Sequence, residues 1–248
     1  MIIKYFENYE EMSKQAAEIV ACEIKLKNTK NNGNFVLGLP TGSTPLGMYK
    51  NLIEMNKSGE IDFSKVTTFN LDEYYPIKRD SSQSYYKFMH DNFFDRVNIN
   101  PENINIPDGE AVDAGSECKN YEEKIKKSDG IDLMVIGIGA NGHIGFNEPG
   151  SFLLPNTHVA VLTEETKEAN KRFFDSIGEV PDRALTMGMA SIIAKSRKIL
   201  MLVSGDSKTA AFRQFIAGKI TSGNPSTFLY LHNNVTVVSD IAEFAGNE

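Results

Sequence analysis

An apolar run passes directly into a small, hydroxyl-rich turn in the segment Phe35-Val36-Leu37-Gly38-Leu39-Pro40-Thr41-Gly42-Ser43-Thr44-Pro45. The first five residues predict a buried strand, because short apolar runs bounded by turn residues suit strands that are covered on both faces. Pro45 is typical of the first position of a helix, and Thr44 of its N-cap. We therefore expect a strand, a tight turn and a helix to follow one another here.

Further apolar runs alternate with amphipathic stretches on both sides of this segment. Besides 35–39, strands are predicted over 66–69, 131–138, 199–203, 227–231 and 235–238. Helices are predicted over 9–25, 45–56, 85–94, 117–127, 164–174 and 207–217. This alternation indicates a Rossmann-like α/β fold: an open, doubly wound, mostly parallel sheet with helices on both faces. In such a sheet, ligands bind beyond the carboxyl ends of the strands.

The composition fits one domain of this kind. The 248 residues are 41% hydrophobic and 24% charged, and neither a repeat nor a low-complexity linker divides them, so a single domain over 1–248 is predicted. The formal net charge of −7 argues against a nucleic-acid partner, since binding a phosphate backbone usually needs a basic face. An anionic small molecule would have to be held by a few local positive groups and backbone amides.

Targeting signals and cysteines indicate a reduced, cytoplasmic protein. The first residues lack the apolar core of a signal peptide, and no later apolar run approaches the ~20 residues of a membrane span, so no membrane partner is expected. Only Cys22 and Cys118 occur, far apart and without His or Cys at metal-ligand spacing. Neither a disulfide framework nor a metal site is therefore predicted.

The turn 41–44 is a first candidate for chemistry. A helix N-terminus there would aim free N–H groups and the positive end of the helix dipole at an anion. The hydroxyls of Thr41, Ser43 and Thr44 would add donors. Taken by itself, the turn is better interpreted as an ordinary strand-to-helix connection, because it matches neither a Walker loop nor a dinucleotide fingerprint.

A second candidate lies where the predicted strand 66–69 ends, in Asn70-Leu71-Asp72-Glu73-Tyr74-Tyr75. Alternation along a strand sends Asp72 and Glu73 to opposite sides. At most one of the two carboxylates is then expected to act as a base, while the other is solvated or paired. Carboxylates near a strand end are common loop caps, so without further context the structural interpretation is favoured.

The third candidate is the run Gly139-Ala140-Asn141-Gly142-His143-Ile144-Gly145-Phe146-Asn147-Glu148-Pro149, which follows a predicted strand. Its first two glycines permit a tight turn with exposed amides. His143 is one of only four histidines, and an ordinary histidine pKa near ~6.5 suits proton transfer at neutral pH. A histidine bonded to the backbone is the alternative. The position just past a glycine turn at a strand end favours function.

Together these segments resemble the glucosamine-6-phosphate deaminase family, also called the glucosamine-6-phosphate isomerase family. The resemblance extends from residue 35 to residue 240 and includes several long motifs in the same order. They are 37–45, 70–74, Ser84-Tyr85-Tyr86-Lys87-Phe88-Met89, 142–149 and Ala169-Asn170-Lys171-Arg172-Phe173-Phe174. The Asn that precedes Gly-His is similar to a pattern in a shorter branch of the family.

The resemblance implies aldose–ketose isomerisation and hydrolytic deamination of glucosamine 6-phosphate to fructose 6-phosphate and ammonia, without a cofactor or a metal. It implies that Asp72 moves a proton between C2 and C1 of the open-chain sugar. His143 would open the pyranose ring, supported by Glu148 and Asn141. The implied phosphate-binding residues are Thr41, Gly42, Ser43, Thr44, Arg172 and Lys208.

Departures from the family pattern leave alternatives open. Many members have Asp where this chain has Asn141, which can hydrogen-bond but cannot take up a proton as a carboxylate can. The ending Phe228-Leu229-Tyr230-Leu231-His232 is similar to that of relatives acting on galactosamine 6-phosphate, so the C4 epimer is open. A 6-phosphogluconolactonase usually lacks the continuation 146–149, and a non-catalytic sugar-phosphate sensor would need a DNA-binding module. Homo-oligomerisation is open, as is a lid at about 161–182.

Overall fold

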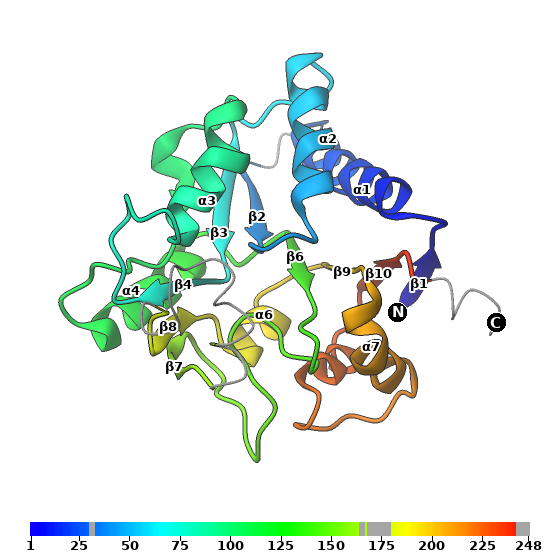
Figure 1. Cartoon of the computed structure of the whole chain (residues 1–248). Helices are drawn as coiled ribbons and strands as arrows, with labels where there is room; N and C mark the ends of the chain where they lie inside the picture. Colours follow the sequence, from blue (N-terminus) through cyan, green and yellow to red (C-terminus); the bar gives the residue numbers. More distant parts are fainter. Residues whose placement is uncertain (30–32, 164–166, 168–179, 242–248) are drawn as a thin grey trace.

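The structure, a computed structural model, describes residues 1–29, 33–163, 167 and 180–241 (Figure 1). The strands are β1 (Ile2–Tyr5), β2 (Phe35–Leu39), β3 (Val66–Asn70), β4 (Asp72–Tyr75), β5 (Ile104–Asn105), β6 (Leu133–Gly137), β7 (His158–Val161), β8 (Arg183–Thr186), β9 (Ile199–Val203) and β10 (Val235–Ser239). The α-helices are α1 (Tyr9–Thr29), α2 (Leu46–Lys57), α3 (Tyr85–Asn92), α4 (Ala114–Lys127), α6 (Met189–Ala194) and α7 (Thr209–Ile216). Short 3₁₀ helices are η1 (Phe94–Arg96), η2 (Pro101–Asn103), η5 (Asp206–Lys208) and η6 (Pro225–Leu231). No helix in the described ranges is both long enough and apolar enough to cross a bilayer.

The central sheet has seven strands in the order β1-β10-β9-β6-β2-β3-β5, and neighbouring strands are parallel throughout. The chain proceeds from β2 through β3 to β5 on one side, and from β6 through β9 to β10 on the other. Connections therefore leave β2 and β6 in opposite directions. This is a topological switch point, where a crevice opens beyond the carboxyl ends of the two strands.

Helices cover both faces of this sheet, as the sequence predicted. Side chains of β2 and β6 alternate, so Leu37 and Val135 join the cluster packed with α1 and α2, whereas Val36 and Met134 join the cluster packed with α4, α6 and α7. Both sets are buried. Because each face of the sheet contributes a separate apolar core, the strands are nearly continuous apolar runs.

A second, antiparallel sheet in the order β4-β8-β7 was not expected from the sequence. Only Leu71 separates β3 from β4, so the chain passes straight from one sheet into the other. The Met187 amide donates to the Leu71 carbonyl at 2.8 Å and joins the end of β8 to this crossing. Figure 1 shows β4, β8 and β7 grouped together below β3 and α3.

The prediction of a strand over 227–231 is wrong, because these residues lie in η6. Pro225 at the start of η6 fixes φ and lacks an amide donor, which suits a helical first turn. The Thr227 hydroxyl donates to the Asn224 carbonyl at 2.7 Å and accepts from the Thr221 amide at 2.9 Å, so polar groups are satisfied locally. A short apolar run by itself cannot distinguish a buried strand from a buried helix.

The predicted N-cap of the helix after β2 is also wrong. The helix begins at Leu46, with Pro45 at the N-cap position and no side-chain cap from Thr44. Instead, the Tyr9 hydroxyl of α1 accepts from the Gly47 amide at 2.8 Å. A residue distant in sequence thus replaces the local cap. The other predicted strands and helices agree with the structure to within a few residues, except the helix over 164–174, of which all but residue 167 lies outside the described residues.

Candidate active site

Four neighbouring strands bring the predicted site residues to one edge of the central sheet. The turn 41–44 follows β2, Asp72 follows β3, the segment 139–148 follows β6, and Lys208 follows β9. These strands are adjacent in the order β9-β6-β2-β3. Since all four are parallel, their carboxyl ends lie together. Arg172 and most of the predicted lid at 161–182 lie outside the described residues.

A cleft of about 650 Å³ lies between the loops that follow β2 and β9. Ser43, Thr44 and Lys208 line it, together with Lys50, Ser204 and Ser207. Hydroxyl donors and two lysines thus surround one space, although the whole chain is acidic. No motif in the sequence pointed to Lys50, which lies one turn into α2. Such a lining suits a small anion that carries several acceptor oxygens.

The imidazole of His143 lies directly over Gly139. A methyl group added at Gly139 would come within 2.3 Å of the ring, so only glycine fits there without displacing the histidine. The Gly139 amide donates to the His143 carbonyl at 2.9 Å, and the Gly142 amide donates to the Gly139 carbonyl at 3.0 Å. The ring is therefore held against the end of β6 by a tight, closed turn.

Asn141 and Glu148 lie beside His143. Nδ1 of His143 is 3.3 Å from Oε1 of Glu148, but the angle leaves Nδ1 without an aligned hydrogen bond among the described residues. Asn141 donates from Nδ2 to Glu148 at 2.8 Å, and its Oδ1 accepts the His143 amide at 3.2 Å. The side-chain amide of Asn141 thus connects the backbone of His143 to the carboxylate of Glu148. Catalytic hydrogen bonds are often long in an empty site and shorten when substrate binds.

A second cleft, of about 350 Å³, is lined by Asn141 and Glu148 from the segment 139–148 and by Gln214 from α7.

Asn224, which is fully buried, supports the segment 139–148 from behind. Its Nδ2 donates to the Ala211 carbonyl of α7 at 2.9 Å, and the neighbouring Ser226 amide donates to the Gly142 carbonyl at 2.9 Å. No local pattern indicates this contact, because the residues involved are about 80 positions apart.

Asp72 is the first residue of β4 and is only 6% exposed. It pairs in register with Thr186 of β8, whose hydroxyl accepts the Phe146 amide at 3.1 Å. A methyl group added at Gly145 would lie 3.2 Å from Oδ2 of Asp72. The segment that carries His143 therefore packs against the carboxylate, and Thr186 holds the two together.

The surroundings of Asp72 disfavour its charged form. Burial, and then the negative charge of Glu73, raise the pKa of Asp72 to about 8. Burial also raises the pKa of Glu73, to about 7, against the opposing effect of its hydrogen bonds to backbone amides. A carboxylate with such a pKa is a far stronger base than an exposed one, and it titrates near neutral pH.

Glu73 points away from Asp72 and is paired with backbone, as strand alternation predicted for one of the two carboxylates. It is 2% exposed. Its oxygens accept the amides of Tyr74 at 2.9 Å, Tyr85 at 2.8 Å and Tyr86 at 2.7 Å. The last two amides belong to the first turn of α3, where a negative charge is favourable.

Comparison with known proteins identifies the family. The model of the family described as glucosamine-6-phosphate isomerases/6-phosphogluconolactonase matches residues 7–238, and the chain belongs to this family. A relative named glucosamine-6-phosphate deaminase, from Thermoanaerobacter sp. (strain X514), is 57% identical over 233 residues, which are 94% of this chain and 90% of the relative. Another of that name, from Halothermothrix orenii, is 53% identical over 234 residues, with 94% and 95% covered.

Solved structures agree with this assignment. A monomeric glucosamine-6-phosphate deaminase superposes with a TM-score of 0.93 at 42% identity, covering 99% of each chain. A 6-phosphogluconolactonase from Thermotoga maritima gives a TM-score of 0.73 at 19% identity, covering 96% of this chain and 98% of the other. The second likeness shows that the two proteins have the same fold.

The buried position of Asp72 predicts how its replacement changes stability. Because the folded-state pKa is raised, the stability that protonated Asp72 contributes is present below pH ~4 and is lost as pH rises through about 8. Asp72→Asn cannot ionise, so its free energy of unfolding relative to wild type should increase with pH, by up to about 1.4 kcal/mol per pH unit. Urea unfolding at several pH values between 5 and 8 measures this difference.

The exposed Asp80 offers a control for this measurement. Asp80→Asn should change the free energy of unfolding by less than about 0.5 kcal/mol throughout. Parallel stability curves for wild type and Asp72→Asn would contradict the prediction, because they would mean that Asp72 has the same proton affinity in the folded and unfolded chains.

Proposed function

We propose that this chain deaminates glucosamine 6-phosphate and releases fructose 6-phosphate and ammonia. Relatives at 53% and 57% identity have the name of this enzyme, and their match extends over nearly the whole chain. The observation that carries the proposal is the packing of Asp72 against the segment of His143, at the same edge of the sheet as a cleft lined by hydroxyls and lysines. This arrangement offers a base, a proton shuttle and an anion site at a single edge of the sheet.

The 6-phosphate is proposed to bind in the larger cleft. Its oxygens would accept hydrogen bonds from the turn Thr41, Gly42, Ser43 and Thr44, and Lys208 would neutralise charge from the other side. Arg172 is proposed for the same role on the resemblance alone, since it lies outside the described residues. Anchoring the phosphate here would place the sugar carbons toward Asp72 and His143.

Ring opening is the first chemical step, and it is assigned to His143. The imidazole would take the proton of the C1 hydroxyl and deliver a proton to the ring oxygen, which gives the open-chain aldose. Glu148 would stabilise the protonated imidazole of His143. Asn141 would hold Glu148 and the backbone of His143 in place. Of the two residues beside His143, only Glu148 has a carboxylate, since the side chain of Asn141 is a neutral amide.

Asp72 is assigned the proton transfer that follows. It would remove the proton at C2, which is acidic because it is adjacent to the C1 aldehyde, and the resulting enolamine would be reprotonated at C1. The imine at C2 then adds water to give a carbinolamine. Loss of ammonia leaves the ketone of fructose 6-phosphate, so one water is consumed for each ammonia released. A raised proton affinity at Asp72 suits a carbon acid of this kind.

The gluco epimer is the proposed substrate, and galactosamine 6-phosphate is the alternative suggested by the sequence 228–232. We expect the purified chain to release ammonia from glucosamine 6-phosphate with a kcat/KM at least about tenfold above that for the galacto epimer, because an unpaired sugar hydroxyl in a polar site is costly. A coupled ammonia assay measures both. Release from neither epimer, with hydrolysis of a 6-phosphogluconolactone instead, would contradict the proposal.

Replacing Asp72 should separate proton abstraction from ring opening. Asp72→Asn is expected to abolish exchange of the C2 proton with solvent, because its amide cannot accept the proton. The proton NMR signal of C2 in deuterated buffer measures the exchange. Asp80→Asn, at an exposed position, is the matched control and should exchange like wild type. Exchange retained in Asp72→Asn would remove Asp72 from this role.

The contact between Gly139 and His143 predicts a large effect of a small change. Gly139→Ala should push the imidazole out of place and lower kcat/KM for deamination by about 100-fold, the order of effect of a misplacement near 1 Å. Gly137→Ala, on the same strand, is the control, since a methyl group there meets no atom within 4 Å among the described residues. Equal activity of the two variants in the ammonia assay would argue against a role for the His143 ring.

A further inference from the structure

Glu73 lies beside the proposed base, and the deamination mechanism given above assigns it no role. Its buried carboxylate takes three backbone amides, from Tyr74, Tyr85 and Tyr86. Two of these amides are the first two of α3, so the side chain joins β4 to the N-terminus of that helix. The helix dipole and the amides favour the ionised form at this place.

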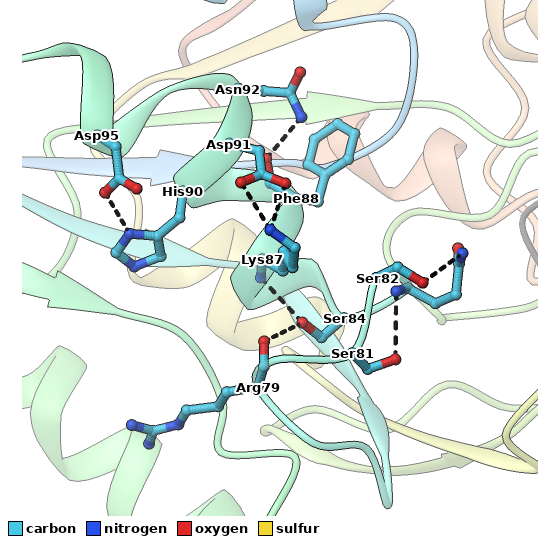
Figure 2. A network of polar contacts seen from close by, with 11 residues as sticks. Arg79, Ser81, Ser82, Ser84, Lys87, Phe88, His90, Asp91, Asn92 and Asp95 are labelled. Carbon is cyan, nitrogen blue, oxygen red and sulfur yellow. Dashed lines mark hydrogen bonds and ion pairs between the residues drawn. The ribbon is translucent and has the colours of Figure 1, made fainter.

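A second side chain caps the same helix without adding charge. The Ser84 hydroxyl accepts the Lys87 amide at 3.0 Å and donates to the Arg79 carbonyl at 2.8 Å. Figure 2 shows Ser84 between these two residues at the first turn of α3. Neutral groups alone could therefore cap the N-terminus of α3. Glu73 adds something that Ser84 does not, namely a buried negative charge next to Asp72.

Among the described residues, Asp72 also raises the pKa of phenols from three helices. They are Tyr49 of α2, Tyr85 of α3 and Tyr121 of α4. Tyr49 donates to the Pro40 carbonyl at 2.5 Å, and Tyr121 donates to the Asn70 carbonyl at 2.7 Å. Burial raises the pKa of all three phenols, so they are neutral. The segment of His143 meets Asp72 through Gly145, which has no side chain.

We propose that Glu73 is a positioning residue for the proton-transfer step, anchored by the α3 amides so that its charge strengthens Asp72 as a base. This inference rests on the proposed function, in which Asp72 abstracts the C2 proton. Three backbone amides stabilise the ionised form of Glu73, whereas burial and the charge of Glu73 both raise the pKa of Asp72. Glu73 loses its proton first, and its charge then holds the remaining proton on Asp72.

Glu73→Gln tests the charge directly, because it keeps the shape of the side chain. The acid limb of kcat/KM against pH should move by about one unit toward lower pH, and kcat on the plateau should fall about threefold to tenfold, as Asp72 becomes a weaker base. Ionisation of the substrate contributes equally in both enzymes, so the difference between the two curves reports on the protein. An unmoved acid limb in Glu73→Gln would overturn the proposal.

Ser84→Ala is the control, since it weakens the same helix cap but removes no charge. It should lower the midpoint of urea unfolding and leave the pH profile in place. A profile that moves in Ser84→Ala as it does in Glu73→Gln would mean that Glu73 acts only through the cap, and would also overturn the proposal. If Asp72→Asn retains C2 exchange, the mechanism itself fails. If it loses exchange while Glu73→Gln leaves the limb unmoved, only the role of Glu73 fails.

A second measurement covers the case in which Glu73→Gln does not fold. The carboxyl carbon of Asp72, assigned by its loss in Asp72→Asn, can be followed by ¹³C NMR in the wild type as pH changes. Two steps are expected, a small lower one when Glu73 ionises and a larger upper one when Asp72 ionises. A single step would show that no charge acts from Glu73 and would overturn the proposal.

Discussion

The parallel pairing of β2 with β6 is the constraint on which the site depends. These strands meet through Leu37 opposite Leu133 and Gly38 opposite Met134, and the chain leaves them in opposite directions. Without that reversal, the loops after β2 and β6 would be covered by a crossover helix. With it, the turn 41–44 and the segment 139–148 follow adjacent parallel strands and lie at the same edge of the sheet. The apolar cores on both faces fix these two loops relative to each other, because neither strand can shift without disturbing both cores.

At this edge of the sheet lies a pair of side chains whose burial is electrostatically unfavourable. Asp72 and Glu73 begin the small antiparallel sheet, where they are almost completely buried. A pair of adjacent carboxyl groups in such a place lowers stability near neutral pH, since burial and mutual repulsion both oppose ionisation. The α3 amides offset this cost for Glu73 alone. The different environments give the two carboxyl groups different proton affinities. This is the pattern expected where one carboxyl group acts as a base.

Sequence patterns predicted those parts of the fold and site in which local features suffice. The strands 35–39 and 199–203 were found because burial on both faces produces an uninterrupted apolar run. His143 and Asp72 were singled out as candidates because each follows such a run, and their chemical roles stay predictions. The small sheet was not predicted, since its strands are four residues long and β4 pairs with β8 over more than 100 positions. The contacts of Tyr9, Thr186 and Asn224 are also non-local, and no spacing rule connects them to their partners.

The contacts behind His143 also restrict which residues fit at position 142. Gly142 has φ of +89°, and a methyl group there would come within 2.1 Å of the Asn224 amide oxygen. Position 142 is therefore closed to other residues both by its own backbone and by a side chain 82 positions further along the chain. Replacing Asn224 with a smaller residue would open space at 142 but remove the hydrogen bond to the Ala211 carbonyl of α7. The turn that carries His143 is thus coupled, through one side chain, to the helix that follows β9.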